Sequence, residues 1–144
     1  MESGDTCGMK LDSLEQAIAD YERITGEHVP LEDYTEQQAG CFYDPQNHKY
    51  FKVLPSNEWL IWAIGEREGL SYLLVDQSYG FMKNFVPFLL NIMDVAGLEW
   101  IVTATTRNPK AHIRKWSMVR LPEYDYDFEG RHYFVLKGHK TNLK

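Results

Sequence analysis

A strand–helix–strand pattern at residues 71–105 constrains the fold of this chain more than any other feature of the sequence. Runs rich in apolar and β-branched residues at 71–75 and 100–105 flank a segment whose apolar side chains recur at helical spacing. Two strands joined by a helix pair in parallel through a right-handed crossover. The pattern therefore predicts a sheet that contains at least one parallel pair.

The helix of this unit has recognisable ends in the sequence. Pro87 would cost about 3 kcal/mol in the interior of a helix but little in its first turn. We therefore expect the helix to begin near Asn84, an acceptable N-cap, and to end at Gly97. Its buried stripe is expected to consist of Phe85, Phe88, Leu89, Ile92 and Met93.

The rest of the chain is predicted to be a succession of short elements. Apolar spacing indicates a helix over 14–24 that Gly26 ends, and Pro30 and Gly40 favour a short second helix over 31–38. The further elements are expected in this order: strands at 41–43, 50–53 and 58–64, a turn at 65–69, a loop over 76–83, a helix from 109 to about 119, and a hairpin of 124–128 with 131–136. Short turns between strands favour antiparallel pairing. The predicted fold class is α/β, of the mixed α+β kind, with a mainly antiparallel mixed sheet and helices on both faces.

Length and composition narrow the class of protein further. A chain of 144 residues, 44% of them hydrophobic, is expected to form one domain over 11–144, preceded by a loose arm at 1–10. No run reaches the roughly 20 apolar residues of a membrane span, and the acidic N-terminus is unlike a signal peptide. Cys7 and Cys41 are too few for a disulfide scaffold, and the five histidines lack metal-ligand spacing, so no metal is expected. These features favour a reducing, cytoplasmic setting.

The net charge of −6 is unevenly distributed along the sequence. Residues 1–46 carry 11 acidic and 2 basic side chains, 47–106 carry 6 and 4, and 107–144 carry 4 and 9. One interpretation is that these are the solvated faces of ordinary helices. The other is that the basic C-terminal part meets an anionic ligand.

Three partial motifs resemble those of one known family. Residues 77–82, Gln-Ser-Tyr-Gly-Phe-Met, follow the central strand and resemble the Gln/Arg-x-x-Gly-x-Gly/Ala phosphate loop of the GNAT superfamily of acyl-CoA-dependent N-acyltransferases. Residues 97–102 are similar to that family's passage from its third helix into the next strand. Residues 108–118 are similar to its Asn-x-x-Ala helix, with Ser-Met in place of the usual Gly-Phe. The resemblance covers roughly residues 11–138, and the sequence looks most like small phage-encoded or prophage members of the family. It implies a GNAT-like fold whose first strand is weak or absent here.

This resemblance implies a site for acetyl-CoA as the co-substrate. Backbone N–H groups at the end of the central strand would polarise the acyl carbonyl, and a loop before a helix N-terminus would hold the pyrophosphate. Met82 stands where the family has a small residue, and no Tyr stands in the last helix, where Ile113 or Lys115 takes its place. The implied cofactor-binding residues are Leu74, Val75, Gln77, Gly80, Phe81, Met82, Asn108 and Lys115.

Amine acylation also needs a group to take a proton from the amine and one to protonate the departing thiolate. Asp76, at the end of the central strand, is the favoured base over Glu66 and Glu68. His112 and Tyr79 are candidates for the missing tyrosine, with Tyr124 as a further one. Asp76 as a turn carboxylate and His112 as a surface histidine are the alternative interpretations.

Three functions remain open from the sequence. The first is transfer of an acetyl group to a small-molecule or protein amine. The second is a catalytically degenerate accessory protein, cytoplasmic in a bacterium or a phage-infected host cell, whose acidic N-terminal face binds a partner. The third, a nucleic-acid-modifying enzyme, would use Lys110, Arg114, Lys115 and Arg120, but the overall acidity makes nucleic acid an unfavourable partner. A homodimer is compatible with each.

Overall fold

The computed structural model describes residues 11–143, and side chains from Leu14 onward. The arm expected at 1–10 lies outside these residues. The chain forms two compact units, which we call unit 1 (residues 1–63 and 77–81) and unit 2 (residues 64–76 and 82–144). Two strands, β4 (Trp59–Arg67) and β5 (Leu70–Tyr79), contribute residues to both units. No helix in the described part of the chain is long and apolar enough to span a bilayer.

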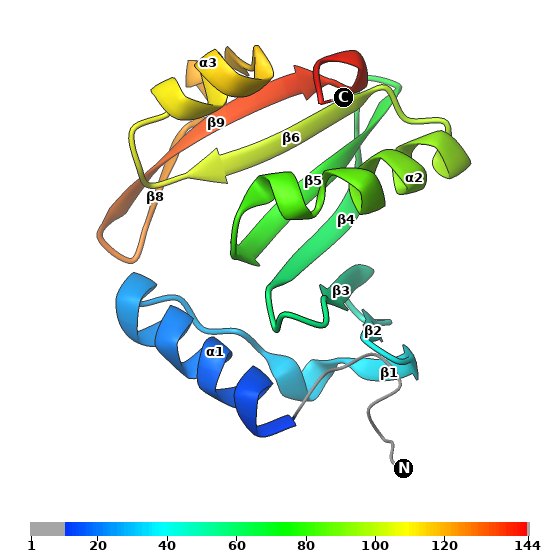
Figure 1. Cartoon of the computed structure of the whole chain (residues 1–144). Helices are drawn as coiled ribbons and strands as arrows, with labels where there is room; N and C mark the ends of the chain where they lie inside the picture. The colour runs from blue at the N-terminus through cyan, green and yellow to red at the C-terminus, as the bar shows by residue number, and fades with distance from the viewer. Residues whose placement is uncertain (1–10, 144) are drawn as a thin grey trace. The chain divides into compact units, whose positions relative to one another are not determined.

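Unit 1 consists of one long helix and an antiparallel sheet (Figure 1). The helix α1 (Leu11–Thr25) ends where predicted, because Gly26 adopts a left-handed conformation and its N–H bonds the Glu22 carbonyl at 2.8 Å. The strands β1 (Thr35–Gln38), β2 (Cys41–Asp44) and β3 (Lys49–Val53) pair in sequence order, and β3 pairs with the first residues of β4.

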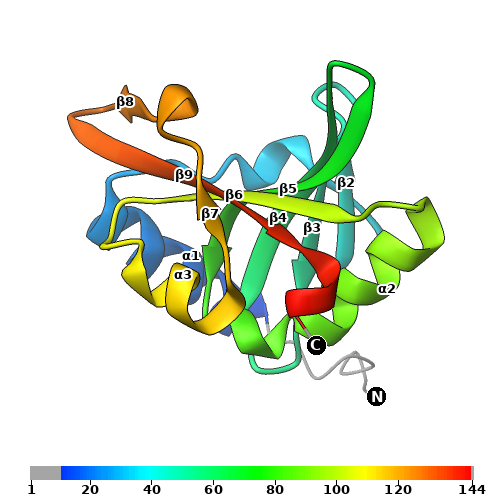
Figure 2. The ribbon, with the colours of Figure 1, turned by 90° about the horizontal axis from the view of Figure 1, so that it is seen from above.

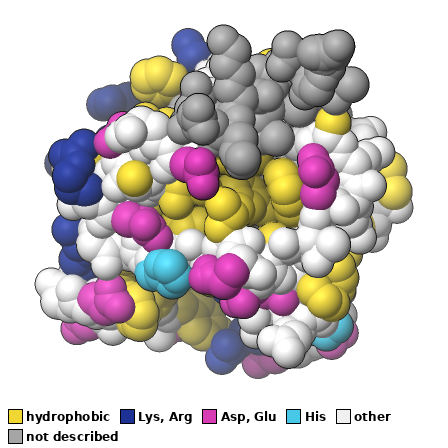
Figure 3. All heavy atoms as spheres, turned by 90° about the horizontal axis from the view of Figure 1, so that it is seen from below, with side chains coloured by type: hydrophobic (Ala, Val, Ile, Leu, Met, Phe, Trp, Pro, Cys, Tyr) yellow, Lys and Arg dark blue, Asp and Glu magenta, His cyan; other side chains and the backbone are white. Residues whose placement is uncertain are grey.

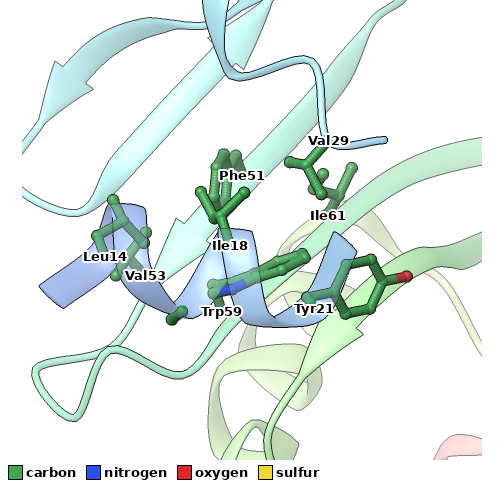
Figure 4. Packing of buried hydrophobic residues seen from close by; sticks show 9 residues of the cluster. Leu14, Ile18, Tyr21, Val29, Phe51, Val53, Trp59 and Ile61 are labelled. Atoms are coloured by element: carbon green, nitrogen blue, oxygen red, sulfur yellow. The ribbon is translucent and has the colours of Figure 1, made fainter. Parts of the chain in front are cut away.

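The core of unit 1 is centred on Trp59 (Figure 4), which is fully buried. The ring of Tyr21 from α1 meets it edge-on at 4.9 Å, and that of Phe51 from β3 at 5.5 Å. The other core residues come from one face of α1, from alternate positions of β3 and β4, and from the loop after α1: Leu14, Ala17, Ile18, Val29, Val53 and Ile61. This alternation is that of a sheet with one face buried under a helix.

Unit 2 contains the predicted strand–helix–strand crossover. Strands β5 and β6 (Trp100–Thr105) pair in parallel and are joined through α2 (Val86–Ala96). The unit is completed by α3 (Lys110–Trp116), β7 (Val119–Arg120), β8 (Tyr126–Phe128) and β9 (Arg131–His139). Its 3-10 turns are Met82–Asn84, Pro122–Tyr124 and Lys140–Asn142, and unit 1 has one at Leu31–Asp33. Strand β9 pairs antiparallel with β6, β7 and β8. The fold class is therefore the mixed, mostly antiparallel α+β sheet that the sequence predicts.

The sheet of unit 2 has two different faces. Figure 2 shows α2 and α3 on one side of β6 and β9, and the β4–β5 turn and the Pro122–Tyr124 turn on the other. On the helix side Leu73, Ile101 and Leu136 are fully buried, and Met118, just after α3, packs against Gly138. On the opposite side Trp100, Val102 and Lys137 are only half-buried. The helices cover one face, and the second is left for other contacts.

The second predicted helix is wrong. Residues 31–33 form a single 3-10 turn, and Thr35–Gln38 is strand β1, in which every residue is exposed. Local signals favoured a helix because Pro30 and Gly40 bracket a polar segment. The strand exists because its backbone pairs with β2, with Thr35 opposite Tyr43. Pairing across the sheet outweighs local preference here.

Several predicted boundaries are also wrong. Strand β4 continues to Arg67, and the turn is only Glu68-Gly69, both with positive φ, as a two-residue hairpin requires. Strand β5 continues to Tyr79 through the predicted loop 76–83. Helix α2 has Phe85 rather than Asn84 as its N-cap, although Pro87 lies in its first turn as predicted. Helix α3 ends at Trp116, because Ser117 adopts a left-handed conformation.

Three aromatic residues before the Glu129-Gly130 turn lie at the surface. Tyr124 belongs to a 3-10 turn, and Tyr126 and Phe128 in β8 are exposed by 46% and 53%. Among the described strands β8 pairs only with β9, so it is an edge strand. The turn Glu129-Gly130, with positive φ at both residues, joins the two strands as predicted.

Candidate functional site

The parallel ladder between β5 and β6 stops before either strand does. Leu74 pairs with Val102 and Val75 with Thr103, which is the last pair. Beyond it β5 continues through Asp76, and β6 continues to Thr105 while pairing with β9 on its other side. The ladder therefore ends at the carboxyl ends of a parallel pair, which is where ligands enter sheets of this kind. Leu74 and Val75, the last two residues of β5 that pair with β6, are half-buried.

The predicted phosphate-loop residues of unit 1 already have partners. The Gln77 side-chain amide donates to Glu27 Oε1 at 3.0 Å and to the His28 carbonyl at 3.3 Å. Glu27 Oε1 also accepts a hydrogen bond of 2.5 Å from the Tyr21 hydroxyl. Gln77 thus fixes the segment after α1 to strand β5, a role that the phosphate-loop motif does not predict.

A carboxylate of the chain accepts the hydrogen bond from the backbone N–H that was expected to bind a phosphate. The N–H of Phe81 donates to Glu58 Oε2 at 3.0 Å, and Ser56 Oγ donates to Glu58 Oε1 at 2.9 Å. The close approach that Gly80 permits is made by the same carboxylate, since a Cβ on Gly80 would lie 2.4 Å from Glu58 Oε2. The backbone donor that the motif assigns to a phosphate is thus bound by an anion of the chain itself.

The side chains of three predicted residues of this segment have different surroundings. The ring of Tyr79 packs on the core of unit 1, with its centroid 6.2 Å from that of Trp59. The Phe81 side chain is 70% exposed. Met82 begins the 3-10 turn that leads into α2 and is half-buried, in unit 2. The structure therefore gives Tyr79 a packing role.

The surroundings of His112, which was predicted to protonate the thiolate in place of the missing tyrosine, favour the neutral imidazole instead. His112 lies on α3, half-buried, and its Nδ1 is buried with no hydrogen-bond partner among the residues that the structure describes. Burial lowers its pKa below the usual value for histidine, because the charged form is the harder one to desolvate. The imidazole is therefore neutral at pH 7 and able to take up a proton.

The other predicted residues of α3 are at or near its surface. Asn108 Oδ1 accepts a hydrogen bond of 3.0 Å from the Lys110 N–H, which makes it the side-chain cap of the helix. The Lys115 ammonium lies 5.2 Å from the centre of the Trp116 ring. Lys110, Arg114 and Lys115 are all exposed, so this short helix presents three cations to solvent.

The predicted site residues divide between the two units. Unit 2 contains Leu74, Val75, Asp76, Met82, Asn108, His112 and Lys115, and unit 1 contains Gln77, Tyr79, Gly80 and Phe81. Asp76 is exposed, in a strand rather than in the predicted loop. Glu27 and Glu58 were not predicted, because each is far in sequence from the residue that it contacts and neither belongs to a motif.

An electrostatic cluster fastens the last hairpin of unit 2. Asp125 accepts hydrogen bonds from the Val135 N–H at 2.8 Å and from Arg120, and both lower its pKa. His132 Nδ1 lies 2.8 Å from Asp127 Oδ1, and chiefly this contact raises the pKa of His132. The cluster is structural, because its carboxylates are engaged by the chain itself.

Comparison with known proteins gives structural neighbours but no sequence relative. Neither a protein-family model nor a curated protein matches the sequence. Among solved structures, the chain is similar to one described as the NatC complex bound to Gag peptide and CoA. That similarity has 12% sequence identity and a TM-score of 0.46, and it covers 63% of this chain and 70% of the other.

Proposed function

We propose that the protein transfers an acyl group from acyl-CoA, with acetyl-CoA as the expected donor, to an amine. The observation that carries this proposal is the end of the parallel ladder at Val75–Thr103, with both strands continuing beyond it. An extended thioester chain can lie between parting strands and bond their unpaired backbone edges. From β3 onward the order of elements, three strands, a helix, a strand, a helix and a closing hairpin, is also that implied by the resemblance to GNAT enzymes, with the short strand β7 added.

The chemistry requires few side chains. A backbone N–H at the end of β5 polarises the thioester carbonyl, and the amine nitrogen attacks its carbon. The C–N bond forms, the C–S bond breaks, and the thiolate leaves with the electron pair of that bond. His112, neutral at pH 7, accepts the proton that the amine loses, and the thiolate is protonated in turn. Asp76 is the second candidate for the base.

The phosphates of the donor are assigned to unit 2. In unit 1 the Phe81 N–H is engaged by Glu58, and a second anion there would meet a like charge. Lys110 and Arg114 on α3 are one helical turn apart and exposed, so they can bind phosphate oxygens together. The donor would therefore be held mainly by side-chain cations and less by the phosphate loop.

Acetyl-CoA binding tests this proposal directly. Titration of the full chain by calorimetry, with thermal unfolding in parallel, should show stabilisation that grows with ligand concentration as RT ln(1 + [L]/Kd). Mass spectrometry of a mixture of amines incubated with the protein and acetyl-CoA should then show products heavier by one acetyl group. Absence of binding at millimolar acetyl-CoA would reject the acyltransferase.

The second candidate is the accessory protein without catalysis, favoured by Glu58 on the phosphate loop and by the missing helix tyrosine. On the face seen from below in Figure 3, Asp and Glu side chains gather while Lys and Arg lie mainly at the margin. Such a face would bind a basic partner, with affinity falling as salt rises. A lysine-rich peptide that binds at low salt and dissociates in 0.5 M salt (about a 4 Å screening length) would favour it, provided acetyl-CoA does not bind. The cytoplasmic, phage-related setting stays a prediction.

A further inference from the structure

A pocket of about 420 Å³ lies within unit 2, on the sheet face that α2 and α3 leave uncovered. Its floor is formed by side chains that project from β5, β6 and β9, among them Tyr72, Val102 and Val135. One wall is the β4–β5 turn, and the other is the segment Leu121–Tyr124. No function proposed above uses these residues.

Three aromatic side chains line the pocket, and each is held in place. The Tyr72 ring lies against Gly65, where a Cβ would come within 2.5 Å of the ring carbon Cζ. Trp100 meets the His139 ring edge-on at 4.8 Å. Tyr124 lies under the Arg67 guanidinium, 4.2 Å from its ring centre. Rings fixed in this way form a preorganised surface for a flat ligand.

Two cations and two carboxylates line the same pocket. Lys137 lies 4.8 Å from the centre of the Trp100 ring, and Arg67 lies over Tyr124. Glu68 and Glu123 are the carboxylates. In the part of the chain that the structure describes, none of the four forms an ion pair. Because these cations and carboxylates are not paired with one another, they can bind the negative and the positive group of a ligand that carries both charges.

We propose that this pocket binds an aromatic α-amino acid. The ring of such a ligand is flat and apolar, as the aromatic lining requires. Its carboxylate suits the guanidinium of Arg67, which can donate two hydrogen bonds, and its ammonium suits Glu123 or Glu68. An aliphatic amino acid lacks the ring, an aromatic amine lacks the anion, and an aromatic acid lacks the cation.

Binding of four related probes to the full chain tests the proposal. L-Tryptophan carries all three features, L-leucine lacks the ring, tryptamine lacks the carboxylate, and indole-3-propionate lacks the amine. Calorimetry should give the lowest Kd for L-tryptophan, with each of the others weaker by about tenfold or more. Equal binding of tryptamine or of indole-3-propionate would overturn the proposal, as would no binding of L-tryptophan at 10 mM (about −2.7 kcal/mol).

Variants locate the binding in this pocket. Arg67→Gln should weaken L-tryptophan binding about tenfold and leave tryptamine binding unchanged, because only the former has a carboxylate. Tyr124→Leu should weaken both. Arg107→Gln, at an exposed position that does not line the pocket, is the matched control and should change neither. Unchanged L-tryptophan binding in Arg67→Gln would overturn the proposal. A far-ultraviolet circular dichroism spectrum like that of the unsubstituted protein excludes misfolding as the cause of any loss of binding.

No step of this test uses acyl-CoA, so its failure and that of the proposed acyl transfer are distinguishable. If the protein binds acetyl-CoA but no aromatic amino acid, the proposed acyl transfer stands and the proposed ligand of this pocket is rejected. If it binds the aromatic amino acid but not acetyl-CoA, the pocket's ligand stands and the acyl transfer is rejected.

Discussion

Several carboxylates of unit 1 bind backbone donors of the same unit, whereas many cations of unit 2 lie over aromatic rings or are exposed to solvent, with Arg120 and Lys140 paired to carboxylates. Asp44 accepts from the Gln46 N–H at 3.0 Å, and Glu22 accepts from the Val29 N–H at 2.7 Å. Glu58 does the same to Phe81. The sequence of unit 1 holds 12 acidic and 4 basic residues, and that of unit 2 holds 9 acidic and 11 basic ones.

This difference indicates which unit can receive an anionic ligand. Unit 1 uses its own anions to satisfy N–H groups that would otherwise be sites for a phosphate or carboxylate. In unit 2 one carboxylate, Asp125, caps a backbone donor, but the exposed cations of α3 and those of the pocket remain available. The sites that we propose for the acyl donor and for the amino acid both lie in unit 2.

The largest expected effect concerns the core of unit 1. Trp59→Ala should lower the free energy of unfolding by about 4 kcal/mol, because it removes a fully buried ring and leaves a cavity. Urea unfolding followed by circular dichroism measures this. Val95→Ala, at a position 82% exposed, is the control and should change little. A small effect at Trp59 would mean that unit 1 is not held by this cluster.

Next in size is the loss of the candidate base. His112→Gln should lower kcat about a hundredfold with acetyl-CoA binding unchanged. Because burial lowers the pKa of His112, the acid limb of the pH–rate profile should lie below pH 6.5, where the imidazole becomes protonated. His132→Gln is the control histidine variant. A profile that is unaltered in His112→Gln would assign the base to Asp76 instead.

Removal of the α3 cations should have a smaller effect. The double variant Lys110→Gln/Arg114→Gln should weaken acetyl-CoA binding about tenfold, through lost phosphate contacts. Lys140→Gln, which removes a cation paired with Asp94, should leave the affinity unchanged. Calorimetry at fixed ionic strength measures both. Equal affinities in the two variants would break the assignment of the phosphates to unit 2.

Glu58→Gln should strengthen acetyl-CoA binding by about threefold, a few tenths of a kcal/mol, because it removes a negative charge near an incoming anion. Glu66→Gln, an exposed carboxylate of unit 2, serves as the matched control. Weaker binding in Glu58→Gln would show instead that Glu58 holds the loop in its binding conformation.

The smallest expected effect concerns the last hairpin. Contact with Asp127 raises the pKa of His132 in the folded protein, so protonated His132 stabilises the folded state. This stabilisation is fully present below the pKa of about 6.5 that His132 has in the unfolded chain, and it is lost as pH rises through the higher pKa of the folded protein. His132→Gln should therefore lower the urea midpoint at pH 6 and not at pH 9. Asp127→Asn should give the same pattern. A difference of equal size at both pH values would contradict this origin.

Local patterns predicted the elements whose contacts are close in sequence. Residues 71–105 form the expected crossover, and Glu129-Gly130 forms the expected turn, because each is specified by spacing and by glycine. The segment 31–38 could not be predicted in this way, since strand β1 exists only through its pairing with β2.

The candidate site was predictable only in part. Leu74 and Val75 were located from the general rule on the ends of parallel strands. Glu58 lies 23 residues from Phe81, and no motif links them. The pocket of unit 2 could have been anticipated from the alternation of Trp100, Val102 and Lys137 with buried residues, but its walls depend on how separate segments fold back.

The path of the chain through β4 and β5 has a consequence for dissection of this molecule. The chain leaves unit 1 after Ala63, returns to it for Gln77–Phe81 and leaves again. Any single cut therefore gives at least one fragment that lacks part of its own unit. A cut after Phe81 keeps unit 1 whole but leaves residues 64–76 of unit 2 attached to it, and a cut after Ala63 keeps unit 2 whole but leaves residues 77–81 of unit 1 attached. No single cut separates the two units, so each is better tested by substitution within the intact chain.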